Sequence, residues 1–283
     1  MRTIVTLLAA HVRMAETEST RAKPPNNWQT YDYYLKAVDT RRSFDRSWTV
    51  GDLYEVRRLV QQSLAIDPNH ARSYALLANT YITVWVNGLD SDFLSPGALD
   101  QAHQLARKAI ELDPNLPEAH ASLGFALVFK REHSVSIAAL ERAFALNPNY
   151  VDWRFAYPFV LAGQARRAID VLDAYMRLDP LYAPYAFGFL GFAHYMLKQY
   201  PQALAALGEC VLQVPTFRSA RAWLAATYAQ LGRMEEARAE AAELVRIQPD
   251  YTIAGVPRLI VGFKSPKDAK HFFDGLRKAG LPQ

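Results

Sequence analysis

The sequence is poor in the residues that form disulfides, metal centres and redox sites. It contains one cysteine, Cys210, so no disulfide can form within the chain and no cysteine cluster can hold zinc or iron. The seven histidines never lie three or four residues apart, which is the spacing that would place two of them on one face of a helix to bind a metal. We therefore predict no metal site.

Motifs of catalysis and cofactor binding are also lacking. There is no Gly-Lys-Ser/Thr phosphate loop and no Gly-x-Ser-x-Gly turn around a nucleophile. The glycines Gly188 and Gly191 do not form a dinucleotide-binding motif, because the third glycine and the preceding strand are missing. We predict that the chain is not an enzyme and needs no cofactor, and we interpret Cys210 as a small buried apolar residue.

Neither a long apolar run nor a strong charge of one sign is present. No stretch approaches the roughly 18 apolar residues of a membrane span, and the formal charge is only +4. Pairs such as Arg41-Arg42 and Arg166-Arg167 are spread along the chain, so the sequence favours neither nucleic acid nor a membrane as partner. Residues 1–26 are too polar after position 10 for a signal peptide, and we expect an amphipathic helix and linker there in a cytoplasmic protein.

What is present is a repeat marked by proline. Hydrophobic residues make up 51% of the chain and charged residues 21%, which is enough apolar surface for a continuous core. The marking prolines lie 46, 34, 32, 35 and 34 residues apart, at Pro68, Pro114, Pro148, Pro180, Pro215 and Pro249. Because proline ends a helix and a following Asn can cap the next one, each proline predicts a junction between helices. The longer first interval is explained by an insert of turn-like composition at residues 86–97.

Small residues recur at fixed places between these prolines. An alanine precedes four of the prolines by twelve residues, at Ala102, Ala168, Ala203 and Ala237. A leucine followed by a small residue recurs earlier in each repeat, at Leu77-Ala78, Leu123-Gly124, Leu190-Gly191 and Leu224-Ala225. Small residues at a helix contact permit the interaxial distance of about 8–10 Å that pairs of helices need. Gly163 and Gly232 fall in the predicted turns within pairs, where glycine adopts a left-handed conformation easily.

This pattern resembles the tetratricopeptide repeat family over residues 27–250. The resemblance implies an all-α fold, a right-handed superhelix of about six helical hairpins with a C-terminal capping helix in residues 251–283. The hairpin boundaries that the prolines predict are 27–68, 69–114, 115–148, 149–180, 181–215 and 216–249. Pro158 inside a first helix predicts a kink there. Ser265 followed by Pro266 predicts the start of the terminal helix, and Gly280 its end.

The two ends of the chain carry a second resemblance. Thr3-Ile-Val, Lys23-Pro24-Pro25 before Tyr31–Leu35, and the closing stretch 275–282 are similar to the C-terminal region of bacterial class III adenylate/guanylate cyclase-related proteins. In that family a cyclase or DNA-binding domain precedes a tetratricopeptide array. The resemblance implies a role in signal transduction through protein contacts, and no residue of this chain matches the family's catalytic positions.

A function without chemistry must come from a surface, and stacked hairpins present a concave groove lined by their first helices. The repeat register predicts that this groove binds a protein or peptide through Asn79, Ile82, Phe125, Phe129, Phe192, Tyr195 and Met196. The same side chains could instead pack against neighbouring helices or the terminal helix, because a shift of one residue exchanges the faces. A second hypothesis is a sensory or regulatory domain whose groove is closed by the C-terminal helix and takes an apolar small molecule between Phe125, Phe129 and Phe192.

Overall fold

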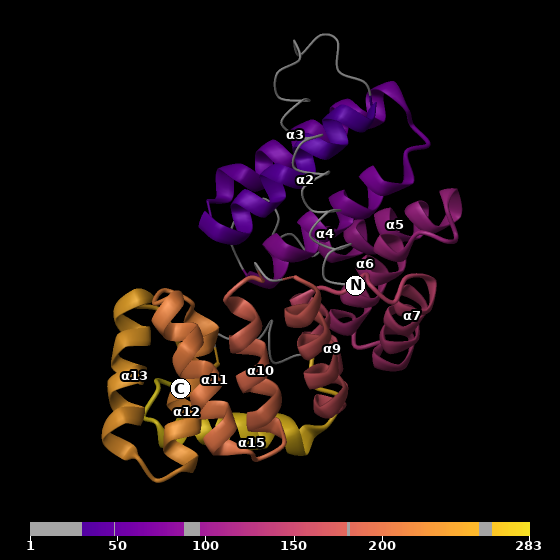
Figure 1. Cartoon of the computed structure of the whole chain (residues 1–283). Helices are drawn as coiled ribbons and strands as arrows, with labels where there is room; N and C mark the ends of the chain where they lie inside the picture. Colours follow the sequence, from indigo (N-terminus) through magenta and orange to yellow (C-terminus); the bar gives the residue numbers. More distant parts are fainter. Residues whose placement is uncertain (1–29, 48, 88–96, 180–181, 255–261) are drawn as a thin grey trace. The chain divides into compact units, whose positions relative to one another are not determined.

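The computed structural model describes residues 30–47, 49–87, 97–179, 182–254 and 262–283, and these residues form helices and no strand. The helices are α2 (Thr30–Ser47), α3 (Val50–Ile66), α4 (Ala71–Asn87), α5 (Gly97–Leu112), α6 (Pro117–Phe129), α7 (His133–Leu146), the 3-10 helix η3 (Trp153–Phe155), α8 (Ala156–Leu161), α9 (Ala165–Leu178), α10 (Tyr185–Met196), α11 (Tyr200–Gln213), α12 (Arg218–Gln230), α13 (Met234–Ile247) and α15 (Pro266–Lys278). Figure 1 shows successive helices packed as pairs, which confirms the all-α prediction. The helix expected within residues 1–26 and most of the insert at 86–97 lie outside the described residues.

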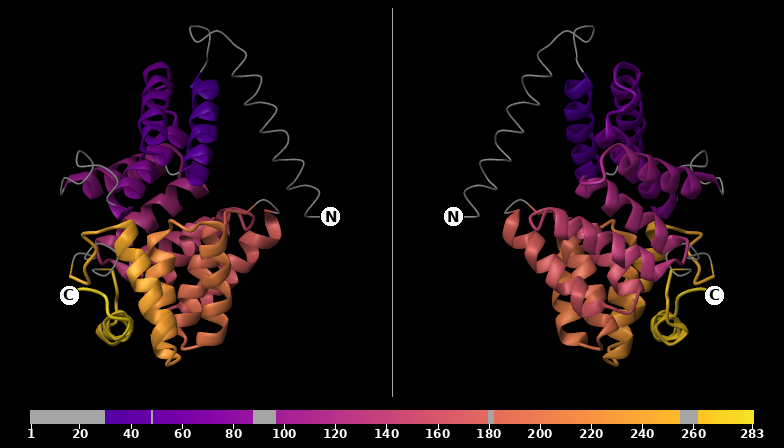
Figure 2. Two further views of the ribbon diagram at one scale, coloured as in Figure 1. Left: turned by 90° about the vertical axis from the view of Figure 1, so that its left-hand side faces the viewer. Right: turned by 90° about the vertical axis from the view of Figure 1, so that its right-hand side faces the viewer.

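The chain divides into two compact units. Unit 1 is residues 1–130 with 135–150, and unit 2 is residues 131–134 with 151–283. Figure 2 turns the same ribbon by 90°, so that the helices of each unit can be followed from the side.

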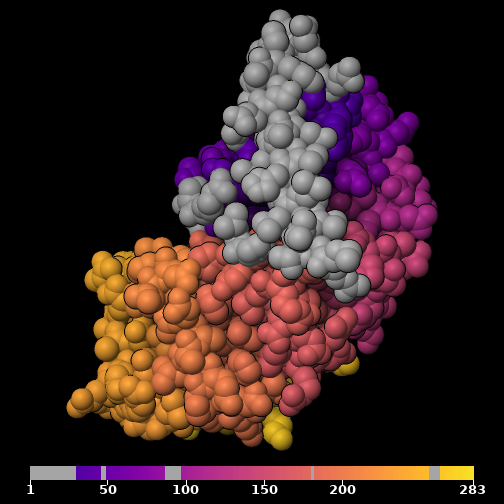
Figure 3. Space-filling model, viewed as in Figure 1, coloured from indigo at the N-terminus to yellow at the C-terminus, as the bar shows by residue number. Residues whose placement is uncertain are grey.

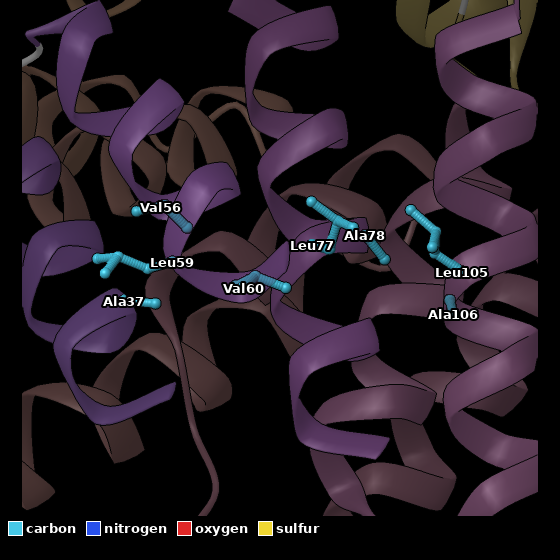
Figure 4. Packing of buried hydrophobic residues seen from close by; sticks show 8 residues of the cluster. All are labelled: Ala37, Val56, Leu59, Val60, Leu77, Ala78, Leu105 and Ala106. Atoms are coloured by element: carbon cyan, nitrogen blue, oxygen red, sulfur yellow. The ribbon is translucent and has the colours of Figure 1, made fainter. Parts of the chain in front are cut away.

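The core of unit 1 is built from the small and branched residues of the repeat. In Figure 4, Val56, Leu59 and Val60 of α3 lie among Ala37 of α2, Leu77 and Ala78 of α4, and Leu105 and Ala106 of α5. All are at least nine-tenths buried. The Leu-Ala pair of the first helix and the alanines of the second thus face one another, as the repeat pattern predicts.

Close approach of paired helices explains the small residue after the leucine. A side chain at Gly124 would place its Cβ 2.8 Å from Leu140 Cγ of α7, and one at Gly191 would lie 2.4 Å from Leu207 Cγ of α11. Such separations are too short for any real contact, so both positions require glycine. Ser136 Oγ donates to the carbonyl of Gly124 at 2.6 Å across the same contact.

A different hydrogen bond from the predicted Asn cap stabilises the junctions at the prolines. The Asp or Asn before the proline accepts a hydrogen bond from the backbone N–H two residues on, as in Asn115 N to Asp113 Oδ1 at 3.0 Å. The cap position of α6 is Leu116, which makes no side-chain cap bond, so the expectation that the Asn after the proline caps the next helix is wrong for this junction. The pre-proline side chain stabilises the turn instead.

Pro158 does not kink a long helix. The structure begins this first helix with the short η3 and continues as α8, in which Pro158 is the third residue. The N–H groups of a first turn have no helical acceptor, so proline loses no hydrogen bond there.

Candidate functional site

The candidate site is the side of unit 2 formed by α8, α10 and α12, the first helices of its three pairs. We call it the first-helix face. The helix α15 lies on this face, against α12 and the C-terminal half of α10, and Figure 1 shows it in yellow, crossing these helices. In Figure 3 the atoms of unit 2 that face the viewer run from rose to orange, and only a few yellow atoms of the C-terminal part appear at the lower edge.

The local sequence explains why α15 forms. Ser265 accepts a hydrogen bond from Asp268 N at 3.2 Å, and Pro266 occupies the first turn, as the sequence predicts. Lys270 and Arg277 pair with Asp274 on the outer surface of the helix. The opposite surface carries Phe272, Gly275 and Leu276, with Ala279 just beyond the helix, and all four are buried.

Phe272 joins α15 to an aromatic cluster on the first-helix face. Its ring centroid lies 5.6 Å from that of Phe192 and 6.1 Å from that of Tyr195, both on α10. Phe192 stacks in turn on Trp223 of α12, with centroids 4.6 Å apart and ring planes at 10°. Phe263, just before α15, reaches Phe192 at 6.2 Å.

Glycine at position 275 brings the helix against the face. A Cβ there would lie 2.4 Å from Tyr195 Oη and 3.0 Å from Ala226 Cβ. The Tyr195 hydroxyl donates to the carbonyl of His271 at 3.1 Å and accepts from Gln230 Nε2 at 3.3 Å. Burial raises the pKa of this hydroxyl above its usual value of 10.0, so it stays a donor at neutral pH.

His271 stacks on Tyr195 with ring centroids 4.8 Å apart. Its Nε2 is buried and has no hydrogen-bond partner among the described residues. Burial lowers the pKa of His271 below 6.5, and the nearby Lys198 ammonium lowers it further. The ring is therefore neutral at pH 7, and the position tolerates a positive charge poorly.

The predicted groove residues of unit 2 fall on this face. Phe192 and Tyr195 are 1% and 0% exposed because α15 and α12 cover them, whereas Met196 at the end of α10 is half-buried. Sequence reasoning missed Trp223, Phe272 and Gly275, which complete the same cluster. The sequence shows Trp223 directly before the repeat pair Leu224-Ala225. Nothing in the sequence predicts which face of these helices α15 contacts.

The predicted groove residues of unit 1 lie on α4 and α6. Phe125 and Phe129 are in edge contact at 5.6 Å, and Trp85 reaches Phe129 at 5.5 Å. Ile82 is fully buried and Asn79 half-buried. These residues all lie in unit 1, whereas the contact with α15 belongs to unit 2.

A polar contact beside them was not predicted. Arg41 of α2 is 5% exposed, and its Nη2 donates to Thr83 Oγ1 of α4 at 3.1 Å, while its guanidinium pairs with Asp45. A buried Arg with these partners ties the first helices α2 and α4 together.

Neither a metal-binding cluster nor an ionised thiol accompanies these surfaces in the part of the chain that the structure describes. No group of three His, Cys, Asp or Glu side chains there could hold a metal ion. Burial raises the pKa of Cys210 to about 12, so this thiol is not a thiolate at neutral pH. No described helix is long and apolar enough to cross a membrane.

Comparison with known proteins identifies the fold. Residues 194–254 match the family model described as tetratricopeptide repeat. The structure is similar to the human IFIT1 dimer with PPP-AAAA, with a TM-score of 0.63, 17% identity, and coverage of 90% of this chain and 60% of that one. It is also similar to the APC/C hetero-tetramer Cut9-Hcn1, with a TM-score of 0.62, 16% identity, and coverage of 90% and 46%. The chain has the tetratricopeptide repeat fold.

Curated proteins with sequence similarity include a transcriptional regulator and a putative adenylate cyclase, both of bacteria. Transcriptional regulator HilA of Salmonella typhimurium is 28% identical over 169 residues, which cover 56% of this chain and 30% of that protein. Putative adenylate cyclase 3 of Rhizobium meliloti is 28% identical over 130 residues, which cover 46% of this chain and 21% of that protein. The chain thus spans less than a third of the length of either relative.

Proposed function

We propose that this chain is a non-catalytic protein-interaction module whose first-helix face in unit 2 binds a helix or peptide of a partner protein. The tetratricopeptide repeat fold supports a protein-interaction scaffold. The observation that carries the finer proposal is α15 itself, an amphipathic helix that lies on this face through Phe272, Gly275 and Leu276. A surface that packs a helix of its own chain has the shape and apolar character to bind one from another chain.

The alternative of an apolar small molecule gains no support from the contacts. The ring of Phe192 has protein rings around it, those of Trp223, Phe263 and Phe272. Phe125 and Phe129 belong to unit 1, so the three phenylalanines of that hypothesis are divided between the units. These contacts favour a protein partner over a small molecule.

The proposed setting is regulation in a bacterial cell. HilA is a transcriptional regulator by its name, and the other relative is a putative adenylate cyclase. We propose that the chain serves, like a segment of such proteins, as the part that contacts another protein. In unit 1, Asn79, Phe125 and Phe129 stay the candidates for a second contact surface, whereas the predicted Ile82 is fully buried and belongs to the core.

Site-directed photo-crosslinking tests the proposal. A diazirine amino acid replaces Met196 at the end of α10 in the full chain, and a matched variant carries it at Met176, a half-buried methionine of the second helix α9. After illumination in cells we expect defined polypeptide adducts from position 196 and none from position 176. Equal adduct patterns at the two positions, or none at 196, would contradict a partner on the first-helix face.

A further inference from the structure

Resting on the proposed function, we infer that the partner of the first-helix face is an amphipathic helix with the residue pattern of α15, and that it binds by taking the place of α15. The pattern is a bulky apolar residue followed by a small residue after three positions, leucine after four and alanine after seven. In α15 these are Phe272, Gly275, Leu276 and Ala279. The spacing is that of a helix that lays one face into a groove.

Each position of the pattern meets a defined part of the face. Phe272 enters the ring cluster of Phe192 and Tyr195. Position 275 has no room for a Cβ beside Tyr195 and Ala226, so the occupant needs a small residue there. Ala279 packs among Ala225, Ala229 and Ala237, which likewise accept only a small side chain.

The polar bonds between α15 and the face are few and do not depend on its side-chain sequence. Tyr195 Oη donates to the backbone carbonyl of His271, a group that every helix supplies. The exposed Lys278 Nζ donates to Gln230 Oε1 at 3.2 Å. Recognition therefore rests on the apolar pattern, and a different helix with that pattern makes the same contacts.

α15 is an imperfect occupant of its own face. It leaves the buried Nε2 of His271 without a partner, and it sets this ring near the ammonium groups of Lys198 and Lys278. A buried ring nitrogen without a hydrogen bond lowers affinity. A partner helix that lacks this histidine avoids that cost, which favours exchange over permanent closure.

The test uses a fluorescent peptide of residues 264–282 as the probe and the full chain as the receptor. In the parent chain the tethered α15 competes at an effective concentration on the order of 1 mM, so the peptide should bind weakly. Gly275→Leu in the receptor keeps α15 helical but forces it off the face, since a Cβ would meet Tyr195 Oη. We expect fluorescence anisotropy to give a Kd at least about 100-fold lower for this variant than for the parent.

Two controls define the result. Lys267→Leu adds leucine at an exposed position of α15 and should leave the receptor like the parent. A probe peptide with Gly275→Leu should bind neither receptor. If Gly275→Leu loses its helical circular dichroism, Phe272→Ala replaces it as the receptor variant.

The inference is overturned if a folded receptor variant does not bind the peptide, or if parent and variant bind it equally. It is also overturned if both receptor variants unfold, because α15 would then be an inseparable part of the core. If an extended peptide binds the first-helix face and the helical probe does not, the partner is an extended segment and the inference is wrong. Adducts at position 196 without peptide binding would contradict this inference alone and would still support the proposed function.

Discussion

At the scale of single residues, the turns within the helix pairs show a feature that the sequence only half reveals. Gly163 and Gly232 have φ of 81° and 75°, as the sequence predicts, but Arg131 and Lys198 take the same left-handed conformation with φ of 65° and 60°. The turn therefore imposes the conformation whatever residue occupies it. Pattern reasoning finds the glycines and misses the other two, because Arg and Lys give no signal for this conformation.

Two alanine substitutions separate this turn from an ordinary helix position. Gly232→Ala should lower the free energy of unfolding by about 1 kcal/mol, because a side chain there is strained at positive φ. Gly208→Ala, within α11 where a Cβ meets no atom within 4 Å, should raise it by roughly 0.5–1 kcal/mol. Urea unfolding followed by circular dichroism measures both, and changes of the same sign would contradict the account.

The buried His133 and the half-buried His271 predict a loss of stability in acid. Burial lowers the pKa of His271, which faces Lys198, Lys278, Asp268 and the Tyr195 ring. Burial, Lys264 and Arg131 lower the pKa of His133, whose two ring nitrogens have no hydrogen-bond partner among the described residues.

Because the pKa values in the folded state lie below 6.5, the unfolded chain binds more protons than the folded chain as the pH falls below that value. The stability present above pH 6.5 is therefore lost progressively in more acidic solution. His271→Phe keeps a ring on Tyr195 and removes one titrating group, so its urea midpoint should fall less between pH 7.5 and 5.5 than that of the parent. The same fall in both proteins would show that His271 does not carry this effect.

At the scale of elements, helix pairs were predictable and the docking of α15 was not. Prolines and alanines at fixed spacing marked the helices, and Ser265-Pro266 marked the start of α15. The face on which α15 lies depends on contacts between residues far apart in sequence, such as Phe272 with Phe192, for which the repeat contains no signal. Phe192 and Tyr195 lie on the first helix α10, and α15 covers them, which is the alternative that the sequence had left open beside an exposed groove.

Truncation of one α15 side chain should release this element first. Leu276 is fully buried, so Leu276→Ala should cost about 2–5 kcal/mol of the interactions that hold α15. Hydrogen exchange should then show faster exchange in α15 while α11 keeps its protection. Lys270→Ala on the exposed surface is the matched control, with a change within about 0.5 kcal/mol. Uniform acceleration in all helices of unit 2 would mean that α15 does not open separately.

At the scale of the whole molecule, the tetratricopeptide repeat fold followed from the sequence because the same physical need recurs in each hairpin. Gly124 and Gly191 permit close helix contact, and the pre-proline Asp or Asn forms the turn. The division into two units did not follow, since the proline spacing continues through residues 131–151 without a break. The proposed function depends on the first-helix face, and the packing of the terminal helix decides which side chains of that face are covered.

The central claim is that the first-helix face of unit 2 is a helix-binding surface occupied by α15. Nuclear Overhauser contacts in the full chain, with labelled phenylalanine, tyrosine and leucine side chains, test it most directly. We predict contacts from the ring of Phe272 to those of Phe192 and Tyr195, whose centroids lie 5.6 and 6.1 Å away. A helical α15 whose Phe272 and Leu276 show no contact with α10 would contradict the account.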